Sequence, residues 1–259
     1  MKVISLVNQK GGVAKTTTSI ALADGLARRG KRVLIIDFDP QAHLTTSFAL
    51  SDDAQCPQAL RFLNIVPGAE FQLQVINKNL SIVTSEIGLE QANTILQTKI
   101  GRERFLARAI KKLSTSAFDY VIIDSNPSLS ILTVNVLAAS DYILIPFKPE
   151  FNSFKGVDLL LESVSDVKTM YPQIEILGFI VTMADKRRRS TAESIEIIEQ
   201  RAQQSGTCVF KSIIRVAVQG ADAASHGKSI YEYAPTSKIS DDYEKLCDEI
   251  LAKLNEKEI

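Results

Sequence analysis

The sequence has few cysteines, no tryptophan and no long apolar segment. The three cysteines among its 259 residues, Cys56, Cys208 and Cys247, are far apart and form no C-x-x-C pair. Their odd number and spacing exclude a disulfide framework and disfavour a metal centre. No apolar run approaches the roughly 20 residues that span a bilayer, and the N-terminal MKVISLVNQKGG lacks a signal-peptide pattern. These absences predict a cytoplasmic protein with free thiols.

An excess of charge of one sign is also absent. The 30 Lys and Arg residues are balanced by 30 Asp and Glu residues, so the formal net charge is +0. A field of the whole molecule therefore cannot attract nucleic acid, and DNA binding would require a local basic patch. Hydrophobic residues make up 45% of the chain, enough for a core on both sides of a sheet. We predict a single domain over residues 1–259, with no helix-turn-helix domain ahead of it.

Short apolar runs alternate along the chain with segments of helical spacing. The runs predicted as strands buried on both faces are Val3–Val7, Val33–Ile36, Leu80–Val83, Tyr120–Ile123, Tyr142–Pro146, Ile176–Val181 and Val209–Ile214. The predicted helices are Thr16–Arg29, Arg102–Leu113, Leu129–Ala139, Phe154–Met170, Thr191–Gln204 and Ser240–Leu254. This alternation predicts an α/β fold with a doubly wound, mostly parallel sheet and helices on both faces. The irregular stretch Ser51–Glu70 is expected to be a surface excursion.

The first predicted strand is followed by a loop suited to binding phosphate. The loop is Lys10-Gly11-Gly12-Val13-Ala14-Lys15-Thr16-Thr17. Its glycines let successive N–H groups point inward, and the helix that follows adds positive potential at its N-terminus. Lys15 can reach the β- and γ-phosphates of a nucleotide, and the Thr16 hydroxyl can ligate Mg²⁺. The alternative is a plain glycine turn, which the lysine pair and the following helix disfavour.

Carboxylates follow two other predicted strands. The second strand ends in Asp37-Phe38-Asp39-Pro40-Gln41, and the strand Tyr120–Ile123 is followed by Asp124. Because ligands of parallel sheets gather at the carboxyl ends of the strands, we expect these acids beside the bound phosphates. Asp124 has the form of a Walker B carboxylate that holds Mg²⁺ through water. Capping of a strand-to-helix turn remains the alternative for Asp37 or Asp39 taken alone.

Together these segments resemble the ParA family of P-loop ATPases, to whose group MinD also belongs. The loop from Lys10 to Thr16 is similar to the family's deviant K-G-G-x-x-K-[ST] loop, and the second segment is similar to its D-x-D-P-Q switch. Near the C-terminus, Ser225-His226-Gly227-Lys228-Ser229-Ile230 resembles the family's S-H-G-K-x-I segment. The resemblance therefore spans the chain, and it implies ATP and Mg²⁺ as ligands.

The resemblance also implies roles for single residues. Lys10 would reach across an ATP-dependent homodimer to the phosphates of the partner subunit. Asp39 would position the attacking water in slow hydrolysis of ATP to ADP and phosphate, and Asp37 would support the magnesium shell. The chain departs from the family pattern at Ala14, where glycine is common, and at Asn126, where proline is usual.

DNA contacts are implied by the same resemblance, since the family binds duplex DNA without sequence preference through arginines on the dimer face. This chain carries Lys186, Arg187, Arg188 and Arg189 after the strand end, and Arg215 upstream of the S-H-G-K segment. Val216 and Gln219 stand where relatives often carry arginines. We predict phosphate contacts from Lys186 to Arg189 and from Arg215, the alternative for the basic run being a solvated loop.

The leading prediction is a nucleoid-associated DNA-partitioning ATPase whose hydrolysis is stimulated by a ParB-type partner. A MinD-like membrane ATPase is the runner-up, but the acidic segment 241–259 would be repelled by anionic lipid. An electron-transfer protein would need paired cysteines for an iron–sulfur cluster. No substrate motif indicates a small-molecule ligase. His226 has no acid or nucleophile pattern around it, so we expect a packing or loop role.

Overall fold

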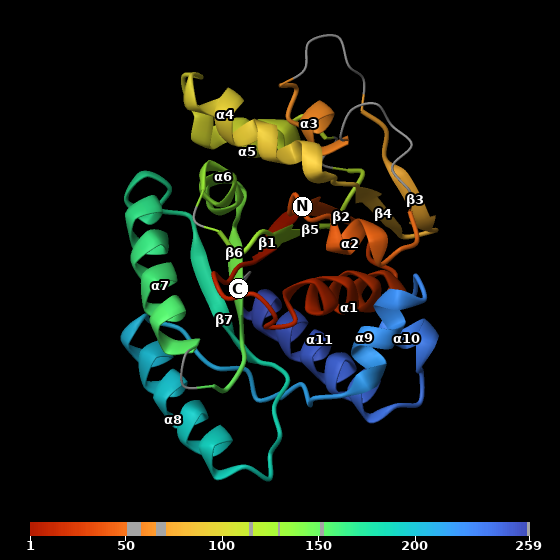
Figure 1. The fold of residues 1–259 in the computed structure, drawn as a ribbon, viewed down its shortest axis with the longest axis vertical. Helices are drawn as coiled ribbons and strands as arrows, with labels where there is room; N and C mark the ends of the chain where they lie inside the picture. Colours follow the sequence, from red (N-terminus) through yellow and green to blue (C-terminus); the bar gives the residue numbers. More distant parts are fainter. Residues whose placement is uncertain (51–57, 66–70, 114–115, 129, 151–152, 258–259) are drawn as a thin grey trace.

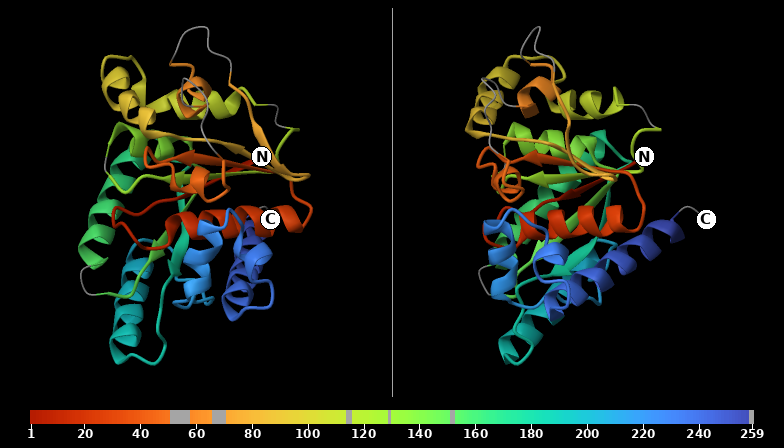
Figure 2. Two further views of the ribbon diagram at one scale, coloured as in Figure 1. Left: turned by 45° about the vertical axis from the view of Figure 1, so that its right-hand side comes forward. Right: turned by 90° about the vertical axis from the view of Figure 1, so that its right-hand side faces the viewer.

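The computed structural model describes residues 1–50, 58–65, 71–113, 116–128, 130–150 and 153–257. Its centre is a seven-stranded sheet with the order β3-β4-β2-β5-β1-β6-β7, and helices cover both faces (Figures 1 and 2). Among the described strands, neighbouring pairs are parallel except for β3 with β4. The predicted α/β fold with a mostly parallel sheet is confirmed.

The strands are β1 (Lys2–Leu6), β2 (Val33–Phe38), β3 (Gln74–Asn77), β4 (Leu80–Val83), β5 (Tyr120–Ser125), β6 (Tyr142–Phe147) and β7 (Glu175–Val181). The longer helices are α1 (Lys15–Arg28), α4 (Gln91–Gln97), α5 (Phe105–Lys111), α6 (Ile131–Ala139), α7 (Ser153–Met170), α8 (Arg189–Gln204), α9 (Val218–Ser225) and α11 (Lys238–Glu256). Shorter helical segments are α2 (His43–Thr46), α3 (Gln58–Phe62), α10 (Ile230–Tyr233) and the 3₁₀ turns η1 (Ile87–Glu90) and η2 (Arg102–Arg104).

Two apolar cores, one on each face of the sheet, explain the continuous apolar runs in the sequence. In β2, Leu34, Ile36 and Phe38 pack into the core beneath α3 to α8, whereas Val33 and Ile35 pack into the core beneath α1 and α9 to α11. Successive side chains of a strand point to opposite faces, so a strand covered on both sides needs an apolar residue at each position. This placement leaves the carboxyl ends of the strands free to carry polar groups.

The prediction of a strand at Val209–Ile214 is wrong. The segment follows the edge of β7, but it forms only scattered bonds there, such as the Phe210 N–H donating to the Phe179 carbonyl at 2.9 Å. Between these bonds, the Glu249 carboxylate of α11 accepts from the N–H groups of Lys211 at 2.7 Å and Ser212 at 3.0 Å. These N–H groups are thereby occupied by a side chain, which interrupts the ladder of a regular strand.

Other boundaries differ only slightly from the predictions. The helix expected from Leu129 begins at Ile131, where the Ser130 side chain accepts from the Leu132 N–H at 3.3 Å as an N-cap. The helix expected over Arg102–Leu113 is divided into η2 and α5. Leu129, Cys56 and most of the predicted surface excursion lie outside the described residues.

Gly178 marks a close approach between β7 and the segment that follows α8. A Cβ atom at Gly178 would lie 2.5 Å from Cε2 of Phe210 and 3.1 Å from the Cys208 carbonyl oxygen. We therefore expect Gly178→Ala to lower the free energy of unfolding by about 1–3 kcal/mol, because the added methyl overpacks this contact. Urea unfolding measures the difference. The matched control is Gly156→Ala in α7, where no atom lies within 4 Å of the added Cβ; equal loss in both variants would contradict the packing argument.

Candidate nucleotide-binding site

A cavity of about 650 Å³ lies at the carboxyl ends of the parallel strands. The loop between β1 and α1 forms one wall, the segment after β2 forms another, and α9 closes a third side through Ala221 and Ala224. From the predicted site, its lining includes Gly11, Gly12, Ala14, Lys15, Thr16, Thr17 and Asp39. The structure thus brings most of the predicted nucleotide-binding residues around one space of ligand size.

The loop achieves its turn with two residues in the left-handed region. Gly12 has φ 69° and Ala14 has φ 57°. An alanine there costs about 1 kcal/mol or more relative to glycine, which accounts physically for the glycine that relatives carry at this position. Val13 is buried, and its carbonyl accepts from the Thr182 hydroxyl at 3.0 Å. The loop is therefore anchored to the end of β7 despite the strain at Ala14.

Asn8 also fixes the loop and was not predicted as a site residue. Its side-chain amide donates to the Pro146 carbonyl at 2.6 Å, and its Oδ1 accepts from the Lys10 N–H at 2.8 Å. Its own carbonyl accepts from Nζ of Lys15 at 3.1 Å. A buried asparagine directly after a strand was the available signal, but its partner on β6 cannot be identified from one sequence.

Lys15 is buried, with 8% of its surface exposed. Burial lowers the pKa of its ammonium group, while the Asp124 and Asp39 carboxylates act in the opposite direction. This cation therefore has little solvent around it and faces the cavity. A phosphate is the kind of group that such a lysine stabilises.

The two acids at the ends of β2 and β5 are direct neighbours, because Asp37 and Asp124 are paired in the register of these strands. Asp124 accepts from the hydroxyls of Thr16 at 2.7 Å and Ser19 at 2.8 Å. Burial raises the pKa of Asp124 to about 6, and burial with the nearby Asp124 charge raises that of Asp37 to about 7. Two buried carboxylates beside a threonine hydroxyl are hard oxygen donors that fit Mg²⁺, whose charge would relieve their repulsion.

Asp37 and Asp39 have different surroundings. Asp37 accepts from both the N–H and the hydroxyl of Thr45, at 2.8 and 2.7 Å, which ties α2 to the end of β2. Asp39 lines the cavity, and its Oδ1 accepts from the Gln41 N–H at 3.0 Å. Asp37 is thus placed to support the cation site, and Asp39 to contact what fills the cavity.

Lys10 lies apart from this cavity. Its Nζ donates to Oε2 of Glu150 at 2.7 Å and to the Ser153 hydroxyl at 3.0 Å, both in the segment that leads from β6 into α7. Lys148 pairs with the same carboxylate at 2.6 Å. The side chain of Lys10 is 27% exposed. Of the two predicted loop lysines, one points into the cavity of its own chain and the other lies on the surface beside Glu150.

Asn126 and His226 are both held by contacts within the chain. The Asn126 amide donates to the Ser128 hydroxyl at 2.7 Å, and its Oδ1 accepts from the Thr133 hydroxyl at 2.9 Å, so hydrogen bonds fix the turn where relatives use proline. His226 caps α9 through the Asp222 carbonyl at 2.7 Å and stacks against Tyr233 with ring centres 4.9 Å apart. These contacts agree with the packing role expected for His226.

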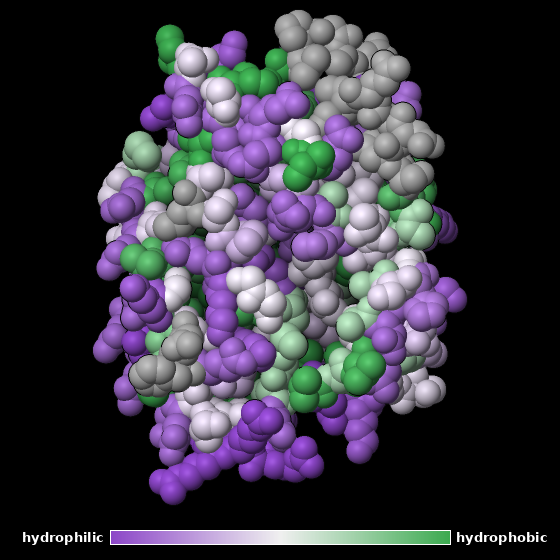
Figure 3. All heavy atoms as spheres, viewed as in Figure 1, coloured by the Kyte–Doolittle hydropathy of each residue, from purple (hydrophilic) through white to green (hydrophobic). Residues whose placement is uncertain are grey.

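The predicted DNA-contact residues form one neighbourhood. Lys186, Arg187 and Arg188 are exposed in the loop before α8, and Arg189 is exposed as the first residue of α8; Figure 3 shows hydrophilic side chains at the lower edge of this face, where Figure 1 places that loop. Asp185 pairs with Arg187 at 3.0 Å and Arg188 at 3.7 Å, and Glu193 pairs with Arg189 at 2.9 Å.

Arg215 lies beside this loop because its backbone bridges to Ala184. Its guanidinium group donates to both carboxylate oxygens of Asp242, at 2.6 and 2.7 Å. Arg215 thus has a buried acidic partner, whereas the ion pairs of Arg187, Arg188 and Arg189 are formed by far more exposed guanidinium groups, where solvent weakens the interaction. None of the described helices is long and apolar enough to cross a membrane.

Comparisons with known proteins agree with this geometry. The sequence pattern of the AAA domain family matches residues 1–176. The sporulation initiation inhibitor protein Soj of Bacillus subtilis is 37% identical over 258 residues, which cover 97% of this chain and 98% of that protein. The chromosome-partitioning ATPase Soj of Thermus thermophilus is 34% identical over 260 residues, covering 98% and 96%. A crystal structure of cobyrinic acid a,c-diamide synthase from Mycobacterium smegmatis with bound ADP and magnesium is similar to this chain with a TM-score of 0.83. The two are 30% identical in sequence, and the match covers 98% of this chain and 96% of the synthase.

Proposed function

The chain belongs to the ParA/Soj family of P-loop ATPases, and from this premise we propose that it is a DNA-partitioning ATPase that acts as an ATP-switched homodimer. One observation carries the proposal: Lys15, Thr16 and Asp39 line one cavity, whereas Lys10 lies outside it on the surface. A lysine of the phosphate loop that does not serve its own cavity is available to a second subunit.

The phosphate loop, Asp39 and the buried acids Asp37 and Asp124 each have a part in ATP hydrolysis under this proposal. The N–H groups from Gly11 to Thr17 and the Lys15 ammonium group bind the phosphates. The Thr16 hydroxyl and the Asp124 carboxylate would hold Mg²⁺, with Asp37 behind them, and the ion would neutralise phosphate charge. Asp39 orients the water that attacks, and a single carboxylate in this role suits slow turnover.

The dimer forms when ATP is bound, because Lys10 of each subunit then has phosphate oxygens of the other subunit as an alternative to Glu150. Two copies related by a twofold axis would exchange this contact reciprocally. Hydrolysis removes the γ-phosphate and with it part of that attraction, so the nucleotide state sets the oligomeric state. A partner of the ParB type that accelerates hydrolysis would thus release the dimer.

We place DNA binding on the loop Lys186–Arg189. With Asp185 and Glu193 included, four cations and two acids leave this loop a formal charge of +2 on a chain whose total is +0. A dimer doubles the patch, which explains physically how ATP could switch affinity for the phosphate backbone. The dimer would then associate with the nucleoid in the cytoplasm.

Replacing Arg187, Arg188 and Arg189 by alanine should weaken ATP-dependent binding to duplex DNA and leave ATP turnover without DNA nearly unchanged. Each phosphate contact contributes about −0.9 to the slope of log affinity against log salt concentration, so the slope should flatten measurably. Fluorescence anisotropy over a salt series measures both quantities. The matched control, Arg102→Ala with Arg104→Ala and Lys111→Ala, also removes three exposed cations. Unaltered DNA affinity and salt slope in the variant without the three arginines would mean that this loop is solvated and makes no contact with DNA.

The membrane-associated alternative is disfavoured because the apolar face of α11 is buried within the protein. The apolar face of this helix, formed by Ile239, Tyr243, Leu246, Ile250 and Leu254, is buried in the core that includes α1. A helix that binds the surface of a bilayer needs its apolar face available to lipid. The exposed side of α11 carries acids such as Asp241, Asp248 and Glu256.

A small-molecule ligase is a second candidate because the similar solved structure is that of a cobyrinic acid a,c-diamide synthase. Such an enzyme could share the phosphate loop and use ATP to activate a carboxylate. The two functions differ in what stimulates ATP hydrolysis, since a partitioning ATPase responds to DNA and to its partner protein. ATP hydrolysis stimulated by cobyrinic acid and an amide donor, but not by DNA, would favour the ligase.

A further inference from the structure

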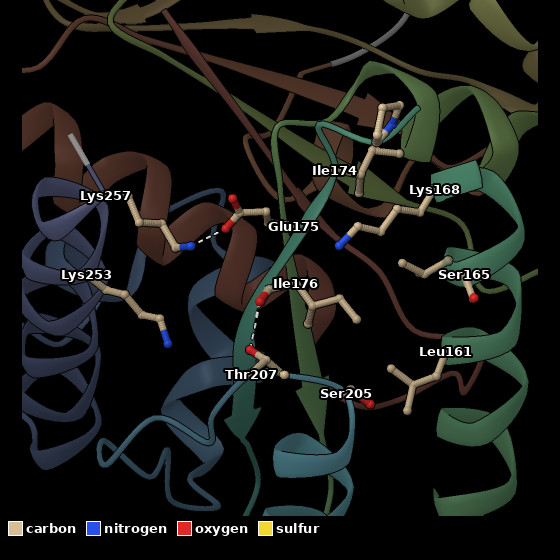
Figure 4. Close-up of a pocket in the computed structure, with 13 residues that line it drawn as sticks. Leu161, Ser165, Lys168, Ile174, Glu175, Ile176, Ser205, Thr207, Lys253 and Lys257 are labelled. Atoms are coloured by element: carbon tan, nitrogen blue, oxygen red, sulfur yellow. Dashed lines mark hydrogen bonds and ion pairs between the residues drawn. The ribbon is translucent and has the colours of Figure 1, made fainter. Parts of the chain in front are cut away.

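A second cavity lies at the opposite end of the parallel strands from the phosphate loop. Its volume is about 530 Å³, and its walls come from α7, the start of β7, the segment after α8 and the end of α11 (Figure 4). The phosphate loop follows the last residue of β1, whereas this cavity is lined by the first residues of β7, Glu175 and Ile176. No residue assigned to nucleotide or DNA binding lines it.

Lysines approach this cavity from two sides. Figure 4 shows Lys168 extending from α7 and Lys253 and Lys257 from α11, with β7 between them. Glu175 is the one carboxylate among the described lining residues, and it pairs with Lys257. The lining therefore carries three cations and one acid, a formal charge of +2.

Among the residues that the structure describes, two of the three ammonium groups have no acidic partner. Nζ of Lys253 lies 2.5 Å from Sγ of Cys208 and 5.7 Å from the centre of the Phe210 ring, while Lys168 extends from the opposite wall. Within the described part of the chain, neither Lys168 nor Lys253 forms an ion pair. Glu175 compensates only one of the three positive charges of the lining, so an anion in the cavity would be attracted to the remaining charge.

Part of the lining is apolar. Leu161 and Val164 of α7, Ile174 just before β7 and Ile176 of β7 contribute it, and the hydroxyl of Thr207 donates to the Ile176 carbonyl at 2.7 Å. An anion held here would therefore have an apolar surface beside it. A ligand that combines a charged group with an apolar or ring portion would satisfy both parts of the cavity.

We propose that this cavity binds a small phosphorylated molecule, whose phosphate is attracted by the charges of Lys168 and Lys253 and whose apolar portion lies against Leu161 and Ile176. Phosphate fits better than carboxylate because a phosphate monoester carries a charge of about −1.5 to −2 at neutral pH, which matches the formal charge of +2 of the lining more closely than the single charge of a carboxylate. The volume is within the range of small-molecule sites, and walls on several sides suit a compact ligand. The proposal is independent of the partitioning function.

Phenyl phosphate is a suitable probe because it carries only the two features that the cavity would recognise. Its binding is measured by saturation-transfer NMR on Lys15→Ala protein, in which the phosphate loop lacks its main cation. We expect saturable binding that is tighter than that of inorganic phosphate, which lacks the ring. Adding Lys168→Ala and Lys253→Ala should weaken phenyl phosphate binding at least about tenfold, since two charge-assisted contacts are lost.

The matched control adds Lys78→Ala and Lys99→Ala, which remove two exposed lysines elsewhere on the fold, and it should leave binding unchanged. A single Lys168→Glu variant, whose side chain is exposed, reports on the same wall without disturbing the Lys253 contact to Cys208. Absence of saturable binding in the Lys15→Ala protein, or equal affinity in the lysine variants and the control, would overturn the proposal.

Discussion

Lys15→Ala is expected to lower the affinity for ATP at least about a hundredfold. Lys15 is the buried cation of the cavity, and a charge-assisted bond to phosphate contributes about 1.5–3 kcal/mol, with two phosphates within reach. Because this ammonium group is buried, its interaction with phosphate takes place with little solvent screening. Isothermal titration with ATP and Mg²⁺ gives the affinity.

The control for Lys15→Ala is Lys31→Ala, which removes an exposed lysine beyond the C-terminal end of α1. Thermal unfolding of both variants separates lost binding from lost folding, and we expect both to unfold near the wild-type temperature in the absence of nucleotide. ATP affinity in Lys15→Ala within a few-fold of the control would remove Lys15 from the phosphate site.

The sheet was predictable because its strands follow a simple physical rule. In β2, alternate residues from Val33 to Phe38 belong to two different cores, so burial on both faces leaves an unbroken apolar run. The edge strand β3 does not obey that rule, since its residues alternate between half-buried and exposed, and Val75 is 74% exposed. The run Val209–Ile214 has the composition of a strand, yet it forms no regular strand because the Glu249 carboxylate accepts hydrogen bonds from two of its N–H groups. That contact joins residues 37 and 38 positions apart.

The candidate site likewise combines features that a local sequence pattern predicts with contacts between residues far apart in the sequence. Lys15 and Thr16 were predicted from the loop motif, and Asp124 from its place after a second apolar strand, because the chemistry of phosphate and magnesium restricts the residue types at the ends of these strands. The contact of Lys10 with Glu150 spans 140 positions and depends on β6 lying beside β1. The α9 wall of the cavity likewise arises from packing of a distant helix. Such partners follow from topology, which no local pattern encodes.

Lys10→Ala should leave ATP binding within a few-fold of wild type and weaken the ATP-bound dimer about a hundredfold or more. The twofold dimer loses two charge-assisted contacts, each contributing about 1.5–3 kcal/mol. The cavity of the same chain keeps Lys15 and Thr16, so nucleotide can still bind. Sedimentation velocity with ATP and Mg²⁺ measures dimerisation, and titration calorimetry measures binding.

The informative control for Lys10→Ala is Lys148→Ala. Lys148 pairs with Glu150 at 2.6 Å, as Lys10 does at 2.7 Å, but it lies outside the phosphate loop. If dimerisation depended on the charge balance at Glu150, both variants would fail alike. If Lys10 acts on the partner's phosphates, only Lys10→Ala fails, and a dimer unaffected by its loss would count against the exchange of this lysine between subunits.

Asp39→Ala completes the test, because it should block the step after dimerisation. Without the carboxylate that orients water, hydrolysis should fall by about 10²–10⁴-fold, while the ATP-bound dimer persists. Lys10→Ala and Asp39→Ala then give opposite oligomeric states in ATP although both lower turnover. A variant combining the two should remain monomeric, since dimerisation precedes hydrolysis in the proposed cycle; a dimer in the combined variant would mean that Lys10 serves hydrolysis without holding the subunits together.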